Sequence, residues 1–347
     1  MTIPAHWQRR WNLAPHLTLG VHSEAQFGLT ARTEDELIEA LQQARSLSVP
    51  TTVIGGGSNI IPAKTVAGLV IKFANRGIRF EASGQGCEVH AAAGENWHAL
   101  VRAALGRGLQ GIECLALIPG SVGAAPIQNI GAYGQEFAQR CVSVRVYSPA
   151  KERIVERAAA ECAFGYRSSR FKVRRDLGEI VLSVQLSLPR AEAPSERQPY
   201  AEVDRELANM GIVHPQPVHI AEAVCRVRRR KLPDWRRLGN VGSVFKNPTV
   251  STARFATLQA QHPGLIGYPR GDSVRLAAGA LIERCGWRGR WQGSAGVWQR
   301  QALVLVQRRS ISAPPDSTAF VALLQAVQDS VEERFDLRLE VEPVQLR

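Results

Sequence analysis

Apolar residues recur with two different spacings along this chain of 347 residues, which predicts a mixture of helices and strands. Helical spacing predicts a helix between residues 29 and 48, with Thr33 as its N-cap and Glu36 at the capping-box position. A second helix is expected to begin at Asn96 and another to cover residues 320–335, and the stretch 217–234 is expected to be helical with Ile220, Val224 and Val227 on one face.

Short apolar or alternating runs predict strands between and after these helices. They cover residues 50–54, 68–73, 87–93, 142–147, 180–188, 301–307 and 336–344. The last run is expected to place Leu337, Leu339 and Val341 on one face of its strand. Residues 190–199 are polar and contain proline, so we expect a surface loop or insertion there. The pattern as a whole predicts an α+β chain with a domain boundary between residues 230 and 240.

Composition and charge narrow the class of protein. Lysine and arginine number 43 against 31 acidic residues, a net charge of +12, which favours anionic partners such as phosphate-bearing ligands or nucleic acid. The densest basic cluster, CRVRRRK over residues 225–231, reads as a helix with most of its arginines facing solvent. Aromatic residues are not interleaved with these arginines, as a single-strand binder would require, so nucleic acid is a weak alternative.

Membrane insertion, secretion and metal binding find no support in the sequence. No run of 18 apolar residues is present, and the first residues lack the apolar stretch of a signal peptide, so we expect a cytoplasmic protein without a membrane partner. The six cysteines contain no C-x-x-C pair and give no metal-site spacing, which favours free thiols.

Two glycine-rich segments are candidates for holding a cofactor. IGGGSN, residues 54–59, follows a predicted strand, where glycines let the backbone approach a phosphate, although a plain tight turn is equally compatible. LALIPGSVGAAPIQNIGAYG, residues 115–134, is too rich in glycine, alanine and proline for a regular element. Long irregular segments inside domains are usually functional, so we expect it to wrap around a flat, phosphate-bearing cofactor.

Two further segments are candidates for chemistry on a substrate. FGYRSS, residues 164–169, sets Arg167 among aromatic residues, where its planar fork could bind a carboxylate or simply form an ion pair. In KLPDWRRLGNVGSVFKNP, residues 231–248, Ser243 lies in a glycine-flanked turn. The G-x-S-x-G pattern of a hydrolase nucleophile is absent, but a serine that donates a proton remains possible.

Taken together, these segments resemble the UDP-N-acetylenolpyruvoylglucosamine reductase family. The resemblance rests on GGGSN, AGENWHALV, LALIPGSVGAAPIQNIGAYG, FGYRSS, KLPD, GNVGSVFKNP, QALVLV and LEVE, in the family's order and over nearly the whole chain. It implies a two-lobed FAD-binding unit of the vanillyl-alcohol-oxidase type plus a C-terminal α+β substrate-binding domain. The expected ranges are 1–75 and 76–232 for the two lobes, with a tyrosine-loop insertion at 190–205, and 233–347 for the substrate domain.

The resemblance also implies an activity, partners and site residues. The activity is NADPH-dependent reduction, through non-covalent FAD, of the enolpyruvyl nucleotide-sugar to UDP-N-acetylmuramate in peptidoglycan precursor synthesis, by an enzyme expected to be a monomer. Arg167 matches the arginine that binds the substrate carboxylate, Ser243 the proton donor and Glu342 the catalytic acid. The positions matching nucleotide-sugar contacts are Tyr200, Lys231, Asn247 and Gln301. The positions matching FAD contacts are Gly55, Gly56, Gly57, Ser58, Asn59, Ile118, Pro119, Gly120, Ser121, Gly123, Ala124, Ile130, Gly131, Ala132 and Tyr133.

The C-terminal match departs from the family in detail. The family usually has proline between its two glutamates and valine-arginine after the second, whereas Val341 intervenes here and Pro343 follows. The alternation puts Glu340 and Glu342 on one strand face, so either could be the acid. A protonated acid and an arginine beside the substrate carboxylate would stabilise the charge left by hydride addition, after which Ser243 would protonate the carbon. Lys231 or Lys246 could reset the serine.

Two other functions compete with this hypothesis. A flavin oxidase of the same fold often attaches FAD through a histidine near the phosphate loop, but none of the eight histidines lies in GGGSN or in residues 115–134. The hypothesis of a nucleic-acid-binding protein does not explain the long glycine-alanine segment, so we place it after the reductase and the oxidase.

Overall fold

The computed structural model describes residues 3–174, 178–192, 197–310 and 314–347, so part of the predicted insertion, residues 193–196, lies outside the described residues. The chain divides into two compact units. The first contains residues 1–11, 25–56 and 67–230, and the second contains residues 12–24, 57–66 and 231–347. This division does not test the predicted separation of the first unit into two lobes at residue 75, which stays a prediction.

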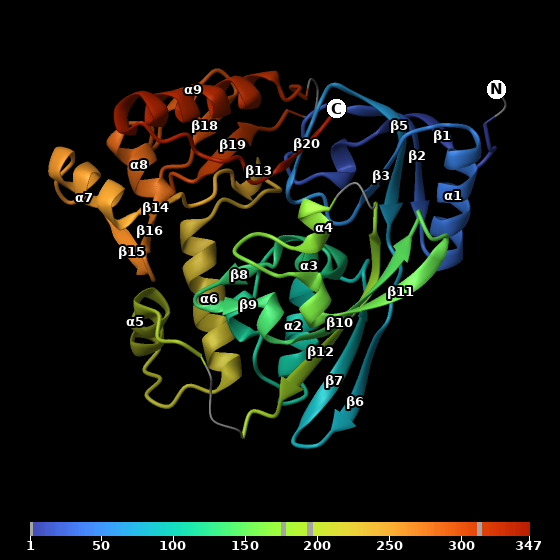
Figure 1. Cartoon of the computed structure of the whole chain (residues 1–347), viewed down its shortest axis with the longest axis horizontal. Coiled ribbons are helices and arrows are strands. Elements are labelled where there is room, and N and C mark those ends of the chain that lie inside the picture. Colours follow the sequence, from blue (N-terminus) through green and yellow to red (C-terminus); the bar gives the residue numbers. More distant parts are fainter. Residues whose placement is uncertain (1–2, 175–177, 193–196, 311–313) are drawn as a thin grey trace. The chain divides into compact units, whose positions relative to one another are not determined.

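The first unit is built on two sheets around one hydrophobic core (Figure 1). One sheet has the order β1(Gln8–Asn12), β2(Glu24–Ala31), β5(Thr65–Phe73), β3(Thr51–Ile54). The other has the order β11(Arg153–Ala158), β10(Cys141–Ser148), β12(Ile180–Pro189), β7(Gly86–Ala92), β6(Ile78–Ser83) and is antiparallel throughout. Leu182, Val184 and Leu186 alternate with more polar positions along β12 and are buried, as the period-two pattern predicted.

Two helices of the first unit begin at the capping residues that the sequence predicts. The helices of this unit are α1(Glu34–Ser46), α2(Trp97–Leu105), α3(Ala125–Gln128), α4(Arg170–Val173), α5(Ala201–Asn209) and α6(Pro217–Lys231). The Thr33 side chain accepts from the Glu36 backbone N–H at 3.1 Å, and Asn96 caps α2 in the same way through Ala99 at 3.0 Å. The Glu36 carboxylate accepts from the Arg32 N–H at 2.6 Å, one residue before the predicted partner.

The second unit has its own core beneath the long helix α9(Thr318–Phe335), which contacts β18 and β19 (Figure 1). Its sheets have the orders β13(Leu238–Ser243), β19(Val304–Arg308), β18(Ala295–Val297), β17(Trp291–Gln292) and β14(Thr249–Ser251), β16(Ser273–Leu276), β15(Gly267–Arg270). Helix α7(Thr252–Gln261) joins β14 to β15, helix α8(Ala278–Arg284) joins β16 to β17 in the other sheet, and β20(Val344–Leu346) pairs in parallel with β4(Ile60–Pro62).

The prediction of a strand over residues 336–344 is wrong. Only the bridge between Val341 and Phe245 forms there, and the strand that does form, β20, begins at Val344. Asp336 ends α9 in the left-handed conformation, and the Leu339 carbonyl accepts from the Gln328 side chain at 2.6 Å. The alternation of residues 337–341 therefore reflects burial of Leu339 against the core and not a paired ladder.

Candidate functional site

The phosphate-loop candidate lies where β3 ends, and it contacts the second glycine-rich segment directly. A β-carbon on Gly56 would lie 2.6 Å from Cα of Gly120, and one on Gly55 would lie 2.1 Å from Oγ of Ser121. No side chain fits in either place, so the sequence requires glycine for the two backbones to meet. The two segments that the sequence analysis singled out separately thus form one feature of the first unit.

The last three residues of the loop belong to the second unit. Gly57 has a φ of 63°, in the left-handed region, and its carbonyl accepts from Thr18 N–H at 3.1 Å. The Asn59 carbonyl accepts from Val344 N–H at 2.9 Å, at the start of β20, and Ser58 is half-buried. The last three residues of the loop are therefore held by backbone hydrogen bonds within the second unit.

The long segment 115–134 contains only short regular elements, among them α3 and the two-residue strand β8(Gly131–Ala132), and it is held by the residues before α2. Val122 N–H donates to the Glu95 carbonyl and Gly123 N–H to the Ala93 carbonyl, both at 2.8 Å. A β-carbon on Gly123 would lie 2.6 Å from that of Ala93. The predicted FAD contacts Ile118, Ala124, Ile130, Gly131, Ala132 and Tyr133 are half-buried on this segment, whereas Pro119 is exposed.

A histidine that the sequence analysis did not single out fixes the start of this segment. Nδ1 of His98, on α2, accepts from Leu117 N–H at 3.0 Å. Leu117 has a φ of 58°, a conformation that branched side chains rarely adopt. Burial and then the charges of Arg102, Arg229 and Arg228 lower the pKa of His98, which favours the neutral ring that can accept this bond.

Arg167 is attached to the same segment. Its Nη2 donates to the Gly131 carbonyl at 2.8 Å, and the side chain is half-buried. The turn that carries it is tied down by Asn129 Nδ2, which donates to the Gly165 carbonyl at 3.0 Å. The arginine and the predicted flavin-lining residues are thus brought together within the first unit.

Tyr200 meets a predicted flavin contact. Its ring packs edge-on against Tyr133 at 5.1 Å between centroids, and it is 42% exposed at the start of α5. Arg228 on α6 hydrogen-bonds Tyr133, whose pKa burial raises to about 12, so the phenol stays protonated.

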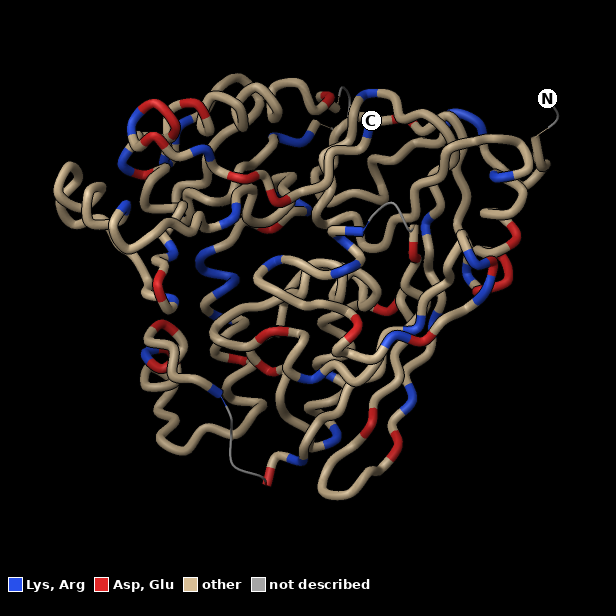
Figure 2. The backbone as a smooth tube through the Cα atoms, viewed as in Figure 1, with Lys and Arg blue, Asp and Glu red and all other residues tan. Residues whose placement is uncertain are grey.

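The sequence analysis missed Arg228 because it lies in the basic run of α6, which is visible in Figure 2. Arg226, Arg229 and Arg230 are exposed as predicted, but Arg228 is half-buried. Helical spacing could have found it, since it lies four positions after the buried Val224 and seven after the buried Ala221.

Ser243 occupies an irregular end of β13 in the second unit. Asn240 pairs with Val306 but Ser243 pairs with Val304, so β13 contains one extra residue, a β-bulge. Gly242, with a φ of 75°, allows it. As a result Ser243 is exposed while Val241 and Val244 on either side are buried.

The segment of Glu342 runs beside that of Ser243. Glu342 N–H donates to the Val244 carbonyl at 2.8 Å, and Phe245 and Val341 form a bridge. Glu340 instead forms an ion pair with Lys246 at 2.6 Å and its side chain is 67% exposed. The two glutamates that the sequence left as alternatives therefore differ in their surroundings: Glu342 is bonded through its backbone to the residue after Ser243, whereas the side chain of Glu340 is exposed and ion-paired.

Two of the remaining predicted substrate contacts, Asn247 and Gln301, lie at α8 in the second unit. Asn247 Oδ1 accepts from Ala278 N–H at 3.0 Å, at the first residue of α8. Gln301 Oε1 lies 3.2 Å from the position of a β-carbon on Gly279, the next residue. Lys231 is connected to them through Trp298, whose ring N–H donates to the Lys231 carbonyl at 2.9 Å.

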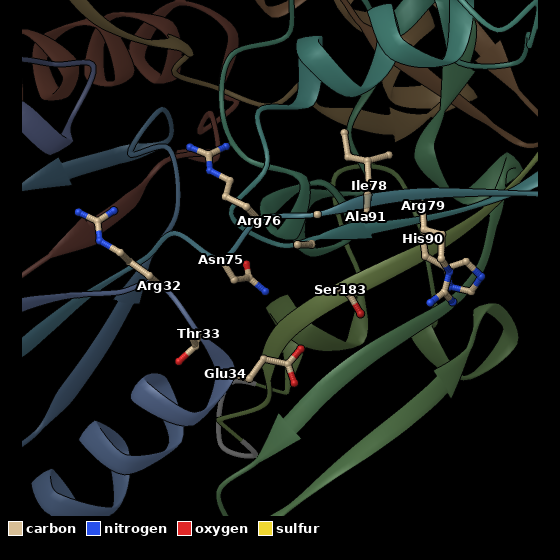
Figure 3. Close-up of a pocket in the computed structure, with 12 residues that line it drawn as sticks. Arg32, Thr33, Glu34, Asn75, Arg76, Ile78, Arg79, His90, Ala91 and Ser183 are labelled. Atoms are coloured by element: carbon tan, nitrogen blue, oxygen red, sulfur yellow. The ribbon is translucent and has the colours of Figure 1, made fainter.

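A polar pocket elsewhere in the first unit contains none of the predicted site residues. Figure 3 shows its lining, which includes Arg32, Glu34, Arg76, Arg79 and His90 around about 510 Å³. Three of its charges are paired: Arg76 with Glu95 at 3.2 Å, Arg79 with Glu81 at 2.5 Å and Glu34 with Arg145 at 2.5 Å. Such pairing leaves little net charge to attract a ligand.

The residues of the first unit fit a dinucleotide with a pyrophosphate group. Gly55, Gly56 and Gly120 leave the two touching backbones without side chains, so backbone N–H groups can approach phosphate oxygens. Lys72 adds a positive charge beside Gly55, to whose carbonyl it donates. Within the described residues, no helix is both long and apolar enough to cross a membrane.

Comparison with known proteins identifies both parts of the chain. Residues 25–157 match the model of an FAD binding domain, and residues 234–346 match that of the UDP-N-acetylenolpyruvoylglucosamine reductase C-terminal domain. The UDP-N-acetylenolpyruvoylglucosamine reductase of Paraburkholderia phymatum is 45% identical over 336 residues, covering 96% of this chain and 95% of that protein. The reductase of Ralstonia nicotianae is 44% identical over 343 residues, covering 96% and 98%. The crystal structure of the reductase from Thermus caldophilus aligns with a TM-score of 0.64 at 25% identity, covering 97% of each chain.

Proposed function

Because the chain belongs to the UDP-N-acetylenolpyruvoylglucosamine reductase family, we propose that it reduces that nucleotide-sugar to UDP-N-acetylmuramate with NADPH, in peptidoglycan precursor synthesis. The predicted fold class, an FAD-binding unit followed by a reductase C-terminal domain, is confirmed, and so are the FAD cofactor and the enzyme class. Action as a monomer in the cytoplasm is part of the proposal.

The observation that carries the proposal is the pairing of the Ser243 segment with the Glu342 segment in the second unit. Glu342 N–H bonds the carbonyl of the residue directly after Ser243, so a hydroxyl and a carboxyl come from neighbouring backbones. A group that can give a proton and an acid that can stabilise a carboxylate-bearing intermediate are the two elements this reduction requires beyond hydride.

We assign the steps to this chain's residues as follows. FAD, when bound, supplies the hydride that it takes from NADPH. Arg167 binds the substrate carboxylate through its planar fork, and its bond to the Gly131 carbonyl keeps it beside the flavin-lining segment. Glu342, in its protonated form, donates a hydrogen bond to the enolate that forms next to this carboxylate. Ser243 then transfers its proton to the carbon beside the carboxylate.

Substrate recognition is assigned to residues around α8 and to the tyrosine of the insertion. Asn247 and Gln301 lie at the start of α8 in the second unit, and together with the ammonium of Lys231 they are proposed to bind the nucleotide-sugar. Tyr200, packed on Tyr133 in the first unit, is proposed to close over the bound substrate.

The test combines the absorption spectrum with turnover. We expect purified protein to be yellow, to release free FAD on heating, and to oxidise NADPH only when the enolpyruvyl nucleotide-sugar is present. A flavin that stays attached after denaturation would favour the oxidase alternative. Protein that neither carries nor takes up FAD would overturn the proposal.

A further inference from the structure

Lys72 lies beside the phosphate loop without a role in the activity described so far. In the register of β3 and β5 it is opposite Ile54, the last residue before the glycines. Its Nζ donates to the Gly55 carbonyl, and the side chain is half-buried. The ammonium group is therefore held at the first residue of the loop.

The charge of this lysine has no acidic counterpart among the residues that the structure describes. No carboxylate there forms an ion pair or hydrogen bond with it. The neighbouring charge that affects it is a second cation, Arg76, whose own partner is Glu95 at 3.2 Å. Burial first, and then Arg76, lower the pKa of Lys72, as expected for an ammonium that lacks an anion.

A half-buried, unpaired charge is unfavourable for the empty protein, and an anionic ligand would relieve it. The ammonium has three N–H donors, of which one is used by Gly55. The ammonium lies at a glycine loop whose backbone meets a second glycine-containing backbone at Gly56 and Gly120, and glycine-rich loops of this kind present backbone N–H groups to phosphate. An unpaired charge and free N–H donors therefore coincide with the glycine loop in the first unit.

We propose that Lys72 contacts and neutralises the pyrophosphate of FAD. The inference rests on the proposed function, because it takes FAD as the ligand. It makes Lys72 a determinant of affinity for the dinucleotide, acting on the phosphates and not on the flavin ring.

The competing explanation is that Lys72 only holds the Gly55 carbonyl and so shapes the loop. The two explanations differ in which ligand senses the substitution. A charge that pairs with pyrophosphate affects FAD and ADP but leaves riboflavin unaffected, whereas a distorted loop weakens every ligand that packs on it.

The experiment measures dissociation constants of FAD, ADP and riboflavin for the full chain after reversible removal of its flavin, by fluorescence titration. Lys72→Met should weaken FAD and ADP by about 10- to 100-fold, the range of a charge-assisted hydrogen bond, and leave riboflavin unchanged. Lys72→Arg should recover part of the loss. The control is Lys151→Met, which removes an exposed lysine at the turn between β10 and β11.

Stability of the flavin-free protein gives a second, independent readout. Removing an unpaired, half-buried charge should leave the melting temperature of Lys72→Met equal to that of the wild type or above it. Weakened FAD together with an unchanged or higher melting temperature supports the inference. Wild-type affinity for FAD in Lys72→Met, or an equal loss for riboflavin, overturns it. A wild-type chain that binds no FAD overturns the proposed function as well, so the two failures are distinguishable.

Discussion

The bond between Leu117 and His98 gives a prediction that two similar substitutions can test. Asparagine can place its side-chain oxygen close to the position of Nδ1, whereas the longer glutamine places it near Nε2. His98→Asn should therefore keep an acceptor for Leu117 N–H, and His98→Gln should lose it. Both variants remove the same ring and its ionisation, so they differ mainly in this hydrogen bond.

The magnitude follows from the geometry. Loss of a partner for a shielded N–H costs about 1–3 kcal/mol. Leu117 also keeps a left-handed conformation with a φ of 58°, which is itself unfavourable by about 1–2 kcal/mol, and the bond helps to hold it. We expect His98→Gln to be less stable by about 1–3 kcal/mol and to release flavin faster, with His98→Asn much closer to the wild type.

The assay is thermal unfolding followed by flavin fluorescence, repeated across pH. Because the pKa of His98 is lowered in the folded protein, the unfolded chain takes up a proton first as pH falls. The contribution of His98 to stability is thus fully present above its pKa in the unfolded chain, about 6.5. It is lost as the pH falls from that value to the lowered pKa in the folded protein. Both variants should lose this component of the pH dependence. Equal melting temperatures for His98→Gln and the wild type would refute the reasoning, as would a His98→Asn variant that is as unstable as His98→Gln.

Three further predictions concern the proposed chemistry. Ser243→Ala should reduce turnover by about 10²- to 10⁴-fold while flavin content and its reduction by NADPH, followed by stopped-flow absorbance, stay the same; near-full turnover would remove the serine from the mechanism. Gly56→Ala should force apart backbones that leave 2.6 Å for a β-carbon, lowering stability by about 1–3 kcal/mol and flavin content with it; a melting temperature like that of the wild type would show that the loop adapts. Glu342→Gln should lose far more turnover than Glu340→Gln, because Glu340 is exposed and ion-paired with Lys246, and the reverse order would exchange their roles.

Much of the first unit could be predicted because its signals are local. Thr33 and Asn96 cap their helices through side-chain chemistry that three or four residues determine. The long strand β12 spans ten residues, enough for its period-two pattern to be unambiguous. The two glycine-rich segments could also be singled out, because close contact between backbones requires glycine and leaves a trace in the composition.

The second unit was harder to predict for a physical reason. Its strands are two to six residues long, too short for periodicity to define them, so the hairpin of β15 and β16 was missed. The alternation at Leu337 and Leu339 indicated a strand, but pairing depends on distant residues, and those bonds go to Gln328 and to the segment 244–246. For the same reason the sequence could not show that Glu342 lies beside the Ser243 segment.

The extra residue in β13 has a consequence for how the serine could change during evolution. In a regular strand, Val241 and Ser243 would point to the same face, which here is the buried one. The bulge reverses the order, so the direction of the hydroxyl is set by the number of residues between Asn240 and Ser243 and not by any side chain that contacts it. Substitutions around Ser243 that keep Gly242 preserve this spacing, but the loss of a single codon in this stretch would turn the serine toward the core. The position of the reactive hydroxyl thus depends on the number of residues in β13 as much as on the presence of a serine.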